Sequence, residues 1–178
     1  DIIIGNYGYF TSPGNKTSKL AAYRNTGTPT LPEFTLTNTN YANLPFLLDT
    51  INNLHPAFAD LDADGDKDMI VGEINGYLHY FQNTAGVGNP AVFILSDYMI
   101  NDDTGDSIDV GQSAAPQIID VNRDGDFDLL IGEQSGNLNY YENTGTTSAA
   151  IWTLVTNTFG GVDVSGIFST GYSIPLIY

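Results

Sequence analysis

Two nonapeptides in this chain concentrate carboxylate side chains at alternating positions. The first, DLDADGDKD, covers residues 60–68, and the second, DVNRDGDFD, covers residues 120–128. They hold nine of the 21 acidic residues of the chain, five in the first stretch and four in the second. Oxygen-rich loops of this kind bind hard cations, and Ca²⁺ takes about six to eight oxygen ligands at roughly 2.3–2.6 Å. Both stretches are therefore candidate calcium-binding loops.

Each loop offers side-chain oxygens at its first, third, fifth and ninth positions and a backbone carbonyl at its seventh position. In the first loop, the candidate ligands are Asp60, Asp62, Asp64, Asp66 (through its carbonyl) and Asp68. In the second loop, they are Asp120, Asn122, Asp124, Asp126 (through its carbonyl) and Asp128. The glycine at the sixth position lets the chain reverse tightly around one ion. The spacing thus predicts two Ca²⁺ sites, one in each loop.

Other interpretations of the acidic loops fit the residues less well. Mg²⁺ prefers fewer protein ligands and a strict octahedron. An EF-hand needs a glutamate at about loop position 12, where this chain has Val71 and Ile131. Soft metals prefer cysteine thiolates as ligands, and this chain has no cysteine. Its two histidines, His55 and His79, lie outside the loops. A solvated acidic turn without metal is the remaining alternative, which two such loops in matching surroundings disfavour.

The surroundings of the two loops match at an offset of 60 residues. Residues 69–86 read MIVGEINGYLHYFQNTAG, and residues 129–146 read LLIGEQSGNLNYYENTGT. Upstream, Pro56 and Pro116 each stand four residues before the first aspartate of a loop. A repeat of this length indicates one supersecondary unit for each copy.

Each copy contains four expected short strands arranged around its loop. They cover residues 57–60, 68–72, 77–82 and 92–95 in one copy, and 117–120, 128–132, 137–142 and 151–154 in the next. The second strand is apolar on both faces, which is typical of a sheet packed between neighbouring sheets. Four antiparallel strands for each repeat predict an all-β fold built from β-propeller blades. A β-sandwich is the alternative fold.

Incomplete copies flank the two complete ones. DIIIG at residues 1–5 matches DMIVG and DLLIG, and GYSIPLIY at residues 171–178 matches the segment before a loop. We expect a partial propeller of about three blades, since closed propellers have roughly four to eight. Its parts are a blade lacking its first strand (1–54), two complete blades (55–114 and 115–174) and the first strand of a next blade (175–178).

The same alignment gives two expectations about the ends of the chain. Asp1 aligns with Asp68, so Asp1 would be a remnant ligand of a third Ca²⁺ site. An open row of blades leaves its end faces bare, and repeat architectures need covered ends. Further blades of the same chain, or a second copy, are therefore expected to complete the ring.

The loop and the strand that follows it resemble a known repeat family. DLDADGDKDMIVG and DVNRDGDFDLLIG are similar to the FG-GAP or VCBS-type repeat, which also occurs in the β-propeller of integrin α-subunits. The resemblance implies a loop that joins the first and second strands of a blade and binds Ca²⁺. The residues that give the FG-GAP motif its name are replaced here by PAFADLD and PQIIDVN. The resemblance therefore implies the fold of the family and not the function of integrins. The recurrent YxNTG pattern resembles secreted bacterial members of the family.

The composition narrows the classes of partner. The formal net charge is −16 with only five lysines and arginines. Nucleic acid is therefore not an expected partner, because phosphate binding needs clustered cations. No apolar run approaches membrane-spanning length, so no membrane insertion is expected. The chain has no cysteine, so bound metal is the candidate staple of a secreted or cell-surface protein.

Other residues with chemical potential are weaker candidates. Glu73 and Glu133 could suggest a carboxylate pair for glycoside cleavage. Their equivalent places in separate copies favour a repeated structural role instead. His79 aligns with Asn139, so this position does not demand an imidazole. The tyrosines of the third strands are expected mainly to pack between blades, and some could stack on sugars.

The leading hypothesis is a non-catalytic binding or adhesion module, a calcium-stabilised propeller within a larger extracellular protein. Its partner would be a protein or glycan ligand at a cell surface. A glycan-binding, lectin-like propeller is the alternative. A third possibility is the propeller domain of a polysaccharide-degrading enzyme, with catalytic residues on an insertion such as residues 6–20.

Overall fold

The chain folds into antiparallel β-sheets, which confirms the all-β expectation. The computed structural model describes residues 1–12, 15–44, 52–165 and 171–176. These residues form 13 strands and one short 3₁₀ turn, η2, at Phe159–Gly161. Within the same ranges, no helix is long and apolar enough to cross a membrane.

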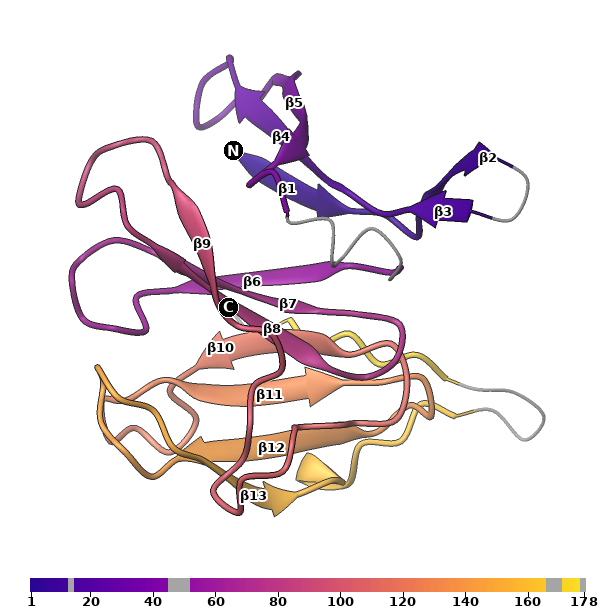
Figure 1. Ribbon diagram of the computed structural model, residues 1–178, viewed down its shortest axis with the longest axis vertical. Coiled ribbons are helices and arrows are strands. Elements are labelled where there is room, and N and C mark those ends of the chain that lie inside the picture. The colour runs from indigo at the N-terminus through magenta and orange to yellow at the C-terminus, as the bar shows by residue number, and fades with distance from the viewer. Residues whose placement is uncertain (13–14, 45–51, 166–170, 177–178) are drawn as a thin grey trace.

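Two sheets of four strands share one construction (Figure 1). The second sheet of the chain contains β6 (His55–Ala59), β7 (Asp68–Gly72), β8 (Leu78–Asn83) and β9 (Phe93–Asp97), in this spatial order. The third sheet contains β10 (Ala115–Ile119), β11 (Asp128–Gly132), β12 (Leu138–Asn143) and β13 (Trp152–Thr156), also in this order. All neighbouring strands are antiparallel. Each strand begins within two residues of its expected position.

The first sheet has three strands and carries a separate hairpin. Its strands are β1 (Ile2–Gly5), β4 (Leu20–Asn25) and β5 (Phe34–Tyr41), in the order β1-β4-β5. The insertion at residues 6–20 contains a two-stranded hairpin, β2 (Tyr9–Ser12) and β3 (Asn15–Thr17), which projects away from the sheet (Figure 1).

The hydrophobic core lies between the sheets, which stack in a row (Figure 1). Met69 and Val71 of β7 belong to a cluster shared with the first sheet, whereas Ile70 belongs to a cluster shared with the third sheet. Alternate residues of a strand point to opposite faces, so β7 is buried on both sides. The expectation that this apolar strand lies between neighbouring sheets is confirmed.

Close contacts of glycines set the spacing between successive sheets. A Cβ atom added to Gly72 would lie 2.3 Å from the carbonyl oxygen of Ala114, just before β10. A Cβ atom added to Gly132 would lie 2.0 Å from the carbonyl oxygen of Ser173. Any side chain at either position would therefore push the next segment away.

Residues 171–176 lie against the end of β11 without forming a strand. The N–H groups of residues 171–173 donate hydrogen bonds to the backbone carbonyl oxygens of Gln134 and Glu133, and within the described ranges no strand pairs with residues 174–176. The expected strand at 175–178 is therefore not formed at 175–176, and residues 177–178 lie outside the described part of the chain.

Candidate metal centre

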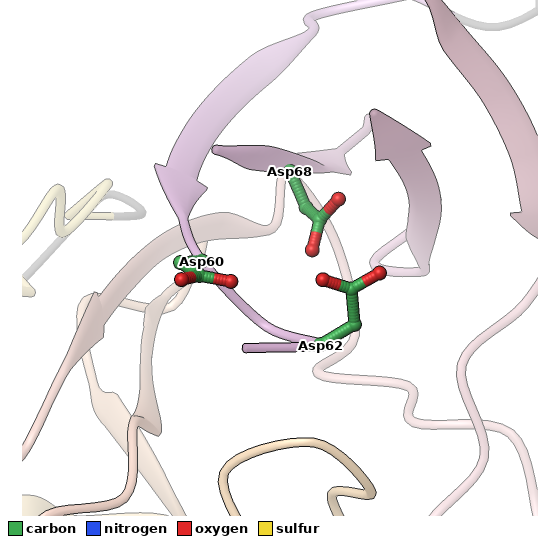
Figure 2. Close-up of side chains that lie close together, drawn as sticks. All are labelled: Asp60, Asp62 and Asp68. Carbon is green, nitrogen blue, oxygen red and sulfur yellow. The ribbon is translucent and has the colours of Figure 1, made fainter. Parts of the chain in front are cut away.

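The first acidic loop brings three carboxylates together between β6 and β7. One oxygen from each of Asp60, Asp62 and Asp68 lies within 4.8 Å of the other two. Figure 2 shows these three side chains turned toward a common point. Two oxygens that each lie about 2.4 Å from one ion are at most about 4.8 Å apart. The spacing therefore suits a single cation of the size of Ca²⁺.

The loop backbone folds back onto its first aspartate. The carboxylate of Asp60 accepts hydrogen bonds from the backbone N–H groups of Asp64 at 3.2 Å and Gly65 at 3.0 Å. Gly65 has a φ of 92°, a conformation that glycine adopts without steric cost. Ala63 also has a positive φ, 61°. This tight reversal positions Asp60 and Asp62 on the same side of the loop.

The second loop repeats this backbone arrangement. The carboxylate of Asp120 accepts hydrogen bonds from the N–H groups of Asp124 at 3.2 Å and Gly125 at 3.1 Å. Arg123 takes the left-handed place of Ala63, with a φ of 66°. A left-handed non-glycine residue at the fourth position of each loop is a feature that sequence reasoning missed.

The last aspartate of each loop is a fully buried anchor. Asp68 accepts hydrogen bonds from the N–H of Asn83 at 2.8 Å and the N–H of Leu61 at 3.0 Å. A third bond comes from the hydroxyl of Tyr80 at 3.1 Å. Burial raises the pKa of the Asp68 carboxyl above its usual value, although these bonds act in the opposite direction. A cation beside Asp68 would offset the cost of burying its charge.

Asp128 makes the same three contacts in the third sheet. Its partners are the N–H of Asn143 at 2.9 Å, the N–H of Val121 at 2.9 Å and the hydroxyl of Tyr140 at 3.2 Å. Sequence reasoning assigned the strand-three tyrosines to packing and missed these bonds. Burial and the nearby carboxylate raise the pKa of both Tyr80 and Tyr140, which keeps each hydroxyl protonated as a donor.

The two loops differ at the third position. The amide of Gln82, on β8, donates a 2.6 Å hydrogen bond to Asp62. In the second loop, the amide of Asn122 donates to Glu142 on β12 at 3.0 Å and to Asp124 at 2.8 Å. Within the described residues, the three-carboxylate grouping occurs in the first loop and not in the second. An amide at position three explains this difference.

Within the described residues, the fifth and seventh residues of the loops are not part of the three-carboxylate group. Asp64 and Asp124 are exposed and accept hydrogen bonds from the N–H groups two residues later, at 3.0 Å and 2.9 Å. The buried side chain of Asp66 accepts a 2.8 Å bond from the N–H of Gly86, which ties the loop to the turn after β8. Asp126 is half-buried. The sequence predicted that these seventh residues bind the ion through their backbone carbonyls. It did not predict the hydrogen bond that anchors the Asp66 side chain.

Asp1 occupies the place that the alignment gives it. Its carboxylate accepts a 2.8 Å hydrogen bond from the N–H of Asn25, the residue that ends β4. Asp68 and Asp128 make the equivalent bond to the last residues of β8 and β12. In the described part of the chain, Asp1 joins no group of three carboxylates.

Glu73 and Glu133 each organise the turn between the second and third strands of their sheets. Glu73 is buried and accepts hydrogen bonds from the N–H groups of Asn75 at 2.8 Å and Tyr77 at 3.3 Å. Glu133 is also buried and accepts bonds from the N–H groups of Ser135 and Asn137. The expected repeated hydrogen-bonding role is confirmed.

His79 is buried on β8 and lies outside the metal centre. Its Nδ1 lies against the carbonyl oxygen of Tyr98, and its ring packs on the ring of Tyr98 at 5.1 Å between centroids. Burial lowers the pKa of His79. The aligned Asn139 is buried too and donates to the carbonyl oxygen of Ile131 at 3.4 Å.

Comparisons with models of protein families, with curated proteins and with solved structures find no match. The function of this chain is therefore inferred from its own loops, sheets and clefts.

Proposed function

We propose that this chain is a calcium-stabilised, non-catalytic binding module of a secreted or cell-surface protein. The observation that carries this proposal is the convergence of Asp60, Asp62 and Asp68 within 4.8 Å on a loop whose backbone is held in place. Like charges at this separation repel by a few kcal/mol for each pair at an effective dielectric constant of about 20. A bound cation removes this repulsion, so binding stabilises the folded state.

Calcium is the cation that the ligand chemistry favours. The loop offers carboxylate oxygens and backbone carbonyls, without thiolates, and such hard ligands suit Ca²⁺. Extracellular modules bind Ca²⁺ with dissociation constants of roughly 10⁻⁴–10⁻³ M, which matches a structural ion outside the cell. The chain has no cysteine, so a secreted domain of this kind would need a staple other than disulfides, and a bound Ca²⁺ ion supplies one.

The sheets support the propeller fold within this proposal. Four-stranded antiparallel sheets stack face to face in sequence order, and the second strand of the middle sheet is buried on both sides. Radial stacking of such sheets builds a β-propeller. The FG-GAP or VCBS-type resemblance of the two loops favours the same interpretation.

Thermal unfolding tests the proposal. Millimolar Ca²⁺ should raise the melting temperature of the metal-free chain, because a ligand that binds only the folded state stabilises it, by about 2.7 kcal/mol at a hundredfold excess over Kd. Asp60→Asn should remove most of the contribution of the first loop. Asp106→Asn, which alters an exposed aspartate outside the loops, is the matched control. Equal melting temperatures in Ca²⁺ and in chelator would refute a structural calcium ion.

Glycan binding is a second candidate function, and one cleft favours it. A cavity of about 290 Å³ between the second and third sheets is lined by both aromatic and polar side chains, including Tyr80, Trp152, Gln82, Asp62 and Asp97. Sugar-binding clefts combine apolar walls with a few polar groups in this way. The carboxylates of Asp62 and Asp97 would repel acidic glycans, so they favour neutral ones.

A glycan array tests this second function. Binding of neutral glycans that is weakened by Asp97→Ala, and not by the control Asp106→Ala, would support it. An array without any signal in the presence of Ca²⁺ would argue against it.

A further inference from the structure

The outer face of the first sheet is apolar at positions that are fully buried elsewhere in the chain. Ile2 and Ile4 of β1 are 39% and 48% exposed, whereas Met69 and Val71, at the equivalent places of β7, are 0% exposed. The equivalent residues of β11, Leu129 and Ile131, are also 0% exposed. In β7 and β11 these side chains pack against the preceding sheet.

The neighbouring strands extend this outer face. Ile2 is paired with Tyr23 of β4, and Tyr23 is paired with Leu36 of β5, so the three side chains share one side of the sheet. Leu36 is 46% exposed, and Phe34, two residues earlier on the same side, is 43% exposed. A contiguous face of large apolar residues of this kind marks an interaction surface.

The first sheet also has a free edge. β7 pairs with β6 on one side, and β11 pairs with β10, whereas within the described residues β1 pairs with β4 alone. The backbone groups on the other side of β1 are therefore available to one more strand.

The opposite end of the stack presents the complementary surface. Ser173 contacts Gly132 as Leu54 contacts Gly5 and Ala114 contacts Gly72. The segment at 172–176 thus occupies the place of the first strand of a following sheet. Its side chains Ile174 and Leu176 are 65% and 77% exposed.

A hollow at this end is shaped for apolar side chains. It measures about 400 Å³ and is lined by Leu138, Val162, Val164 and Pro175, among others. Leu78, the residue equivalent to Leu138 in the second sheet, packs in the cluster that contains Ile131 of the next sheet. Leu138 lacks such a cover within the described residues.

We infer that two copies of this chain associate head to tail. Residues 172–176 of one copy add as a strand to the free edge of β1 in the other copy, and the outer face of the first sheet covers the hollow. The contact repeats an interface that the chain already forms twice, between its first and second sheets and between its second and third sheets. Within the described residues, both halves of that interface are open on one chain, so a second copy is the occupant that fits each of them.

The existing register fixes the alignment of the added strand. Pro56 pairs with Val71, and Pro116 pairs with Ile131. The equivalent pair across the new contact is Pro175 of one copy and Ile4 of the other. Such a heterologous contact closes into a ring or extends into a filament.

Single charges on either surface test this inference in Ca²⁺-saturated protein. Analytical ultracentrifugation of the wild-type chain should show a species larger than a monomer that dissociates on dilution. Ile4→Asp and Ile174→Asp should each give monomers, because each places a charge in the contact. Leu31→Asp, which alters a 77% exposed leucine in a turn, should leave association unchanged. Circular dichroism of each variant checks that the sheets are intact.

Mixing the two variants separates a head-to-tail contact from a symmetric one. The Ile4→Asp chain keeps its C-terminal surface, and the Ile174→Asp chain keeps its N-terminal surface, so an equimolar mixture should restore a dimer through one intact contact. A monomeric wild-type chain at all concentrations would overturn the inference. So would association that survives both substitutions, or variants that remain monomeric when mixed.

Discussion

The carboxylate of Asp62 accepts a 2.6 Å hydrogen bond from the amide of Gln82, and the second loop makes the same contact with acid and amide exchanged. There, Asn122 is the amide on the loop and Glu142 is the acid on the strand, 3.0 Å apart. Each pair therefore contains one carboxylate, which lies on the loop in the first copy and on the third strand in the second copy.

The first prediction follows from this exchange. Glu142→Gln should weaken Ca²⁺ binding at the second loop by about threefold to tenfold, because it removes one negative charge a few ångströms from the site. Titration calorimetry measures the change. Glu33→Gln, which alters an exposed glutamate in a turn of the first sheet, should have no effect. An unchanged affinity in Glu142→Gln would show that the strand carboxylate is electrostatically separate from the loop.

A second prediction concerns pH. Burial raises the pKa of Asp68 above the ordinary value of 3.8. Its contribution to the stability of the metal-free fold is thus fully present below that value and is lost as pH rises through the raised pKa. Protons compete with the cation for this carboxylate. Ca²⁺ affinity should therefore decline on acidification before ordinary aspartates protonate.

Titrations of Ca²⁺ at a series of pH values check this competition. Asp68→Asn removes the titrating group and should flatten this part of the pH profile. An affinity that stays constant in the wild-type chain down to the ordinary range of aspartate would contradict the prediction.

The hydroxyl of Tyr80 gives a third prediction. Tyr80→Phe removes the donor to the buried carboxylate of Asp68 and should lower the free energy of unfolding by about 1–3 kcal/mol, since bonds to charged groups are the stronger ones. Tyr140→Phe should have a similar effect through Asp128. Denaturant unfolding measures both changes. Tyr98→Phe, at a tyrosine that is 42% exposed, is the control. An equally large loss of unfolding free energy in this variant would show that the hydrogen bond to the buried aspartate is not the cause.

The fourth prediction separates the shape of Glu73 from its charge. Glu73→Gln keeps one oxygen, which can still accept from the N–H of Asn75, and loses the second oxygen, which accepts from the N–H of Tyr77. The free energy of unfolding should therefore fall by about 1 kcal/mol. Glu73→Ala leaves these donors without their acceptor and should cost about 1–3 kcal/mol. If the two variants were equally damaging, the negative charge of Glu73, and not only its acceptor oxygens, would be required for stability.

The strands and the clustering of carboxylates in the first loop were predictable from the sequence because their signals are local. The apolar run at β7 and the alternating aspartates of the first loop each lie within a few consecutive residues. The hairpin of β2 and β3 was not predicted, since residues 6–20 are rich in glycine and polar residues and lack a clear alternation of apolar side chains.

The contacts of the loops with the third strands could not be read from spacing alone. Gln82 lies 20 residues from Asp62, and strand pairing brings the two together. The aligned repeats do contain a signal for this contact, because positions 62 and 82 exchange acid and amide with positions 122 and 142. Asp68 is buried for the same non-local reason, since β8 covers it.

Calorimetric titration of Ca²⁺ into the metal-free chain of 178 residues tests the central claim most directly. We predict saturable binding of two ions per chain, with tighter binding at the first loop, where three carboxylates converge. Asp64→Ala should weaken the tighter site, and Asp124→Ala should weaken the other. A titration without saturable heat, together with unchanged unfolding in chelator, would contradict the account.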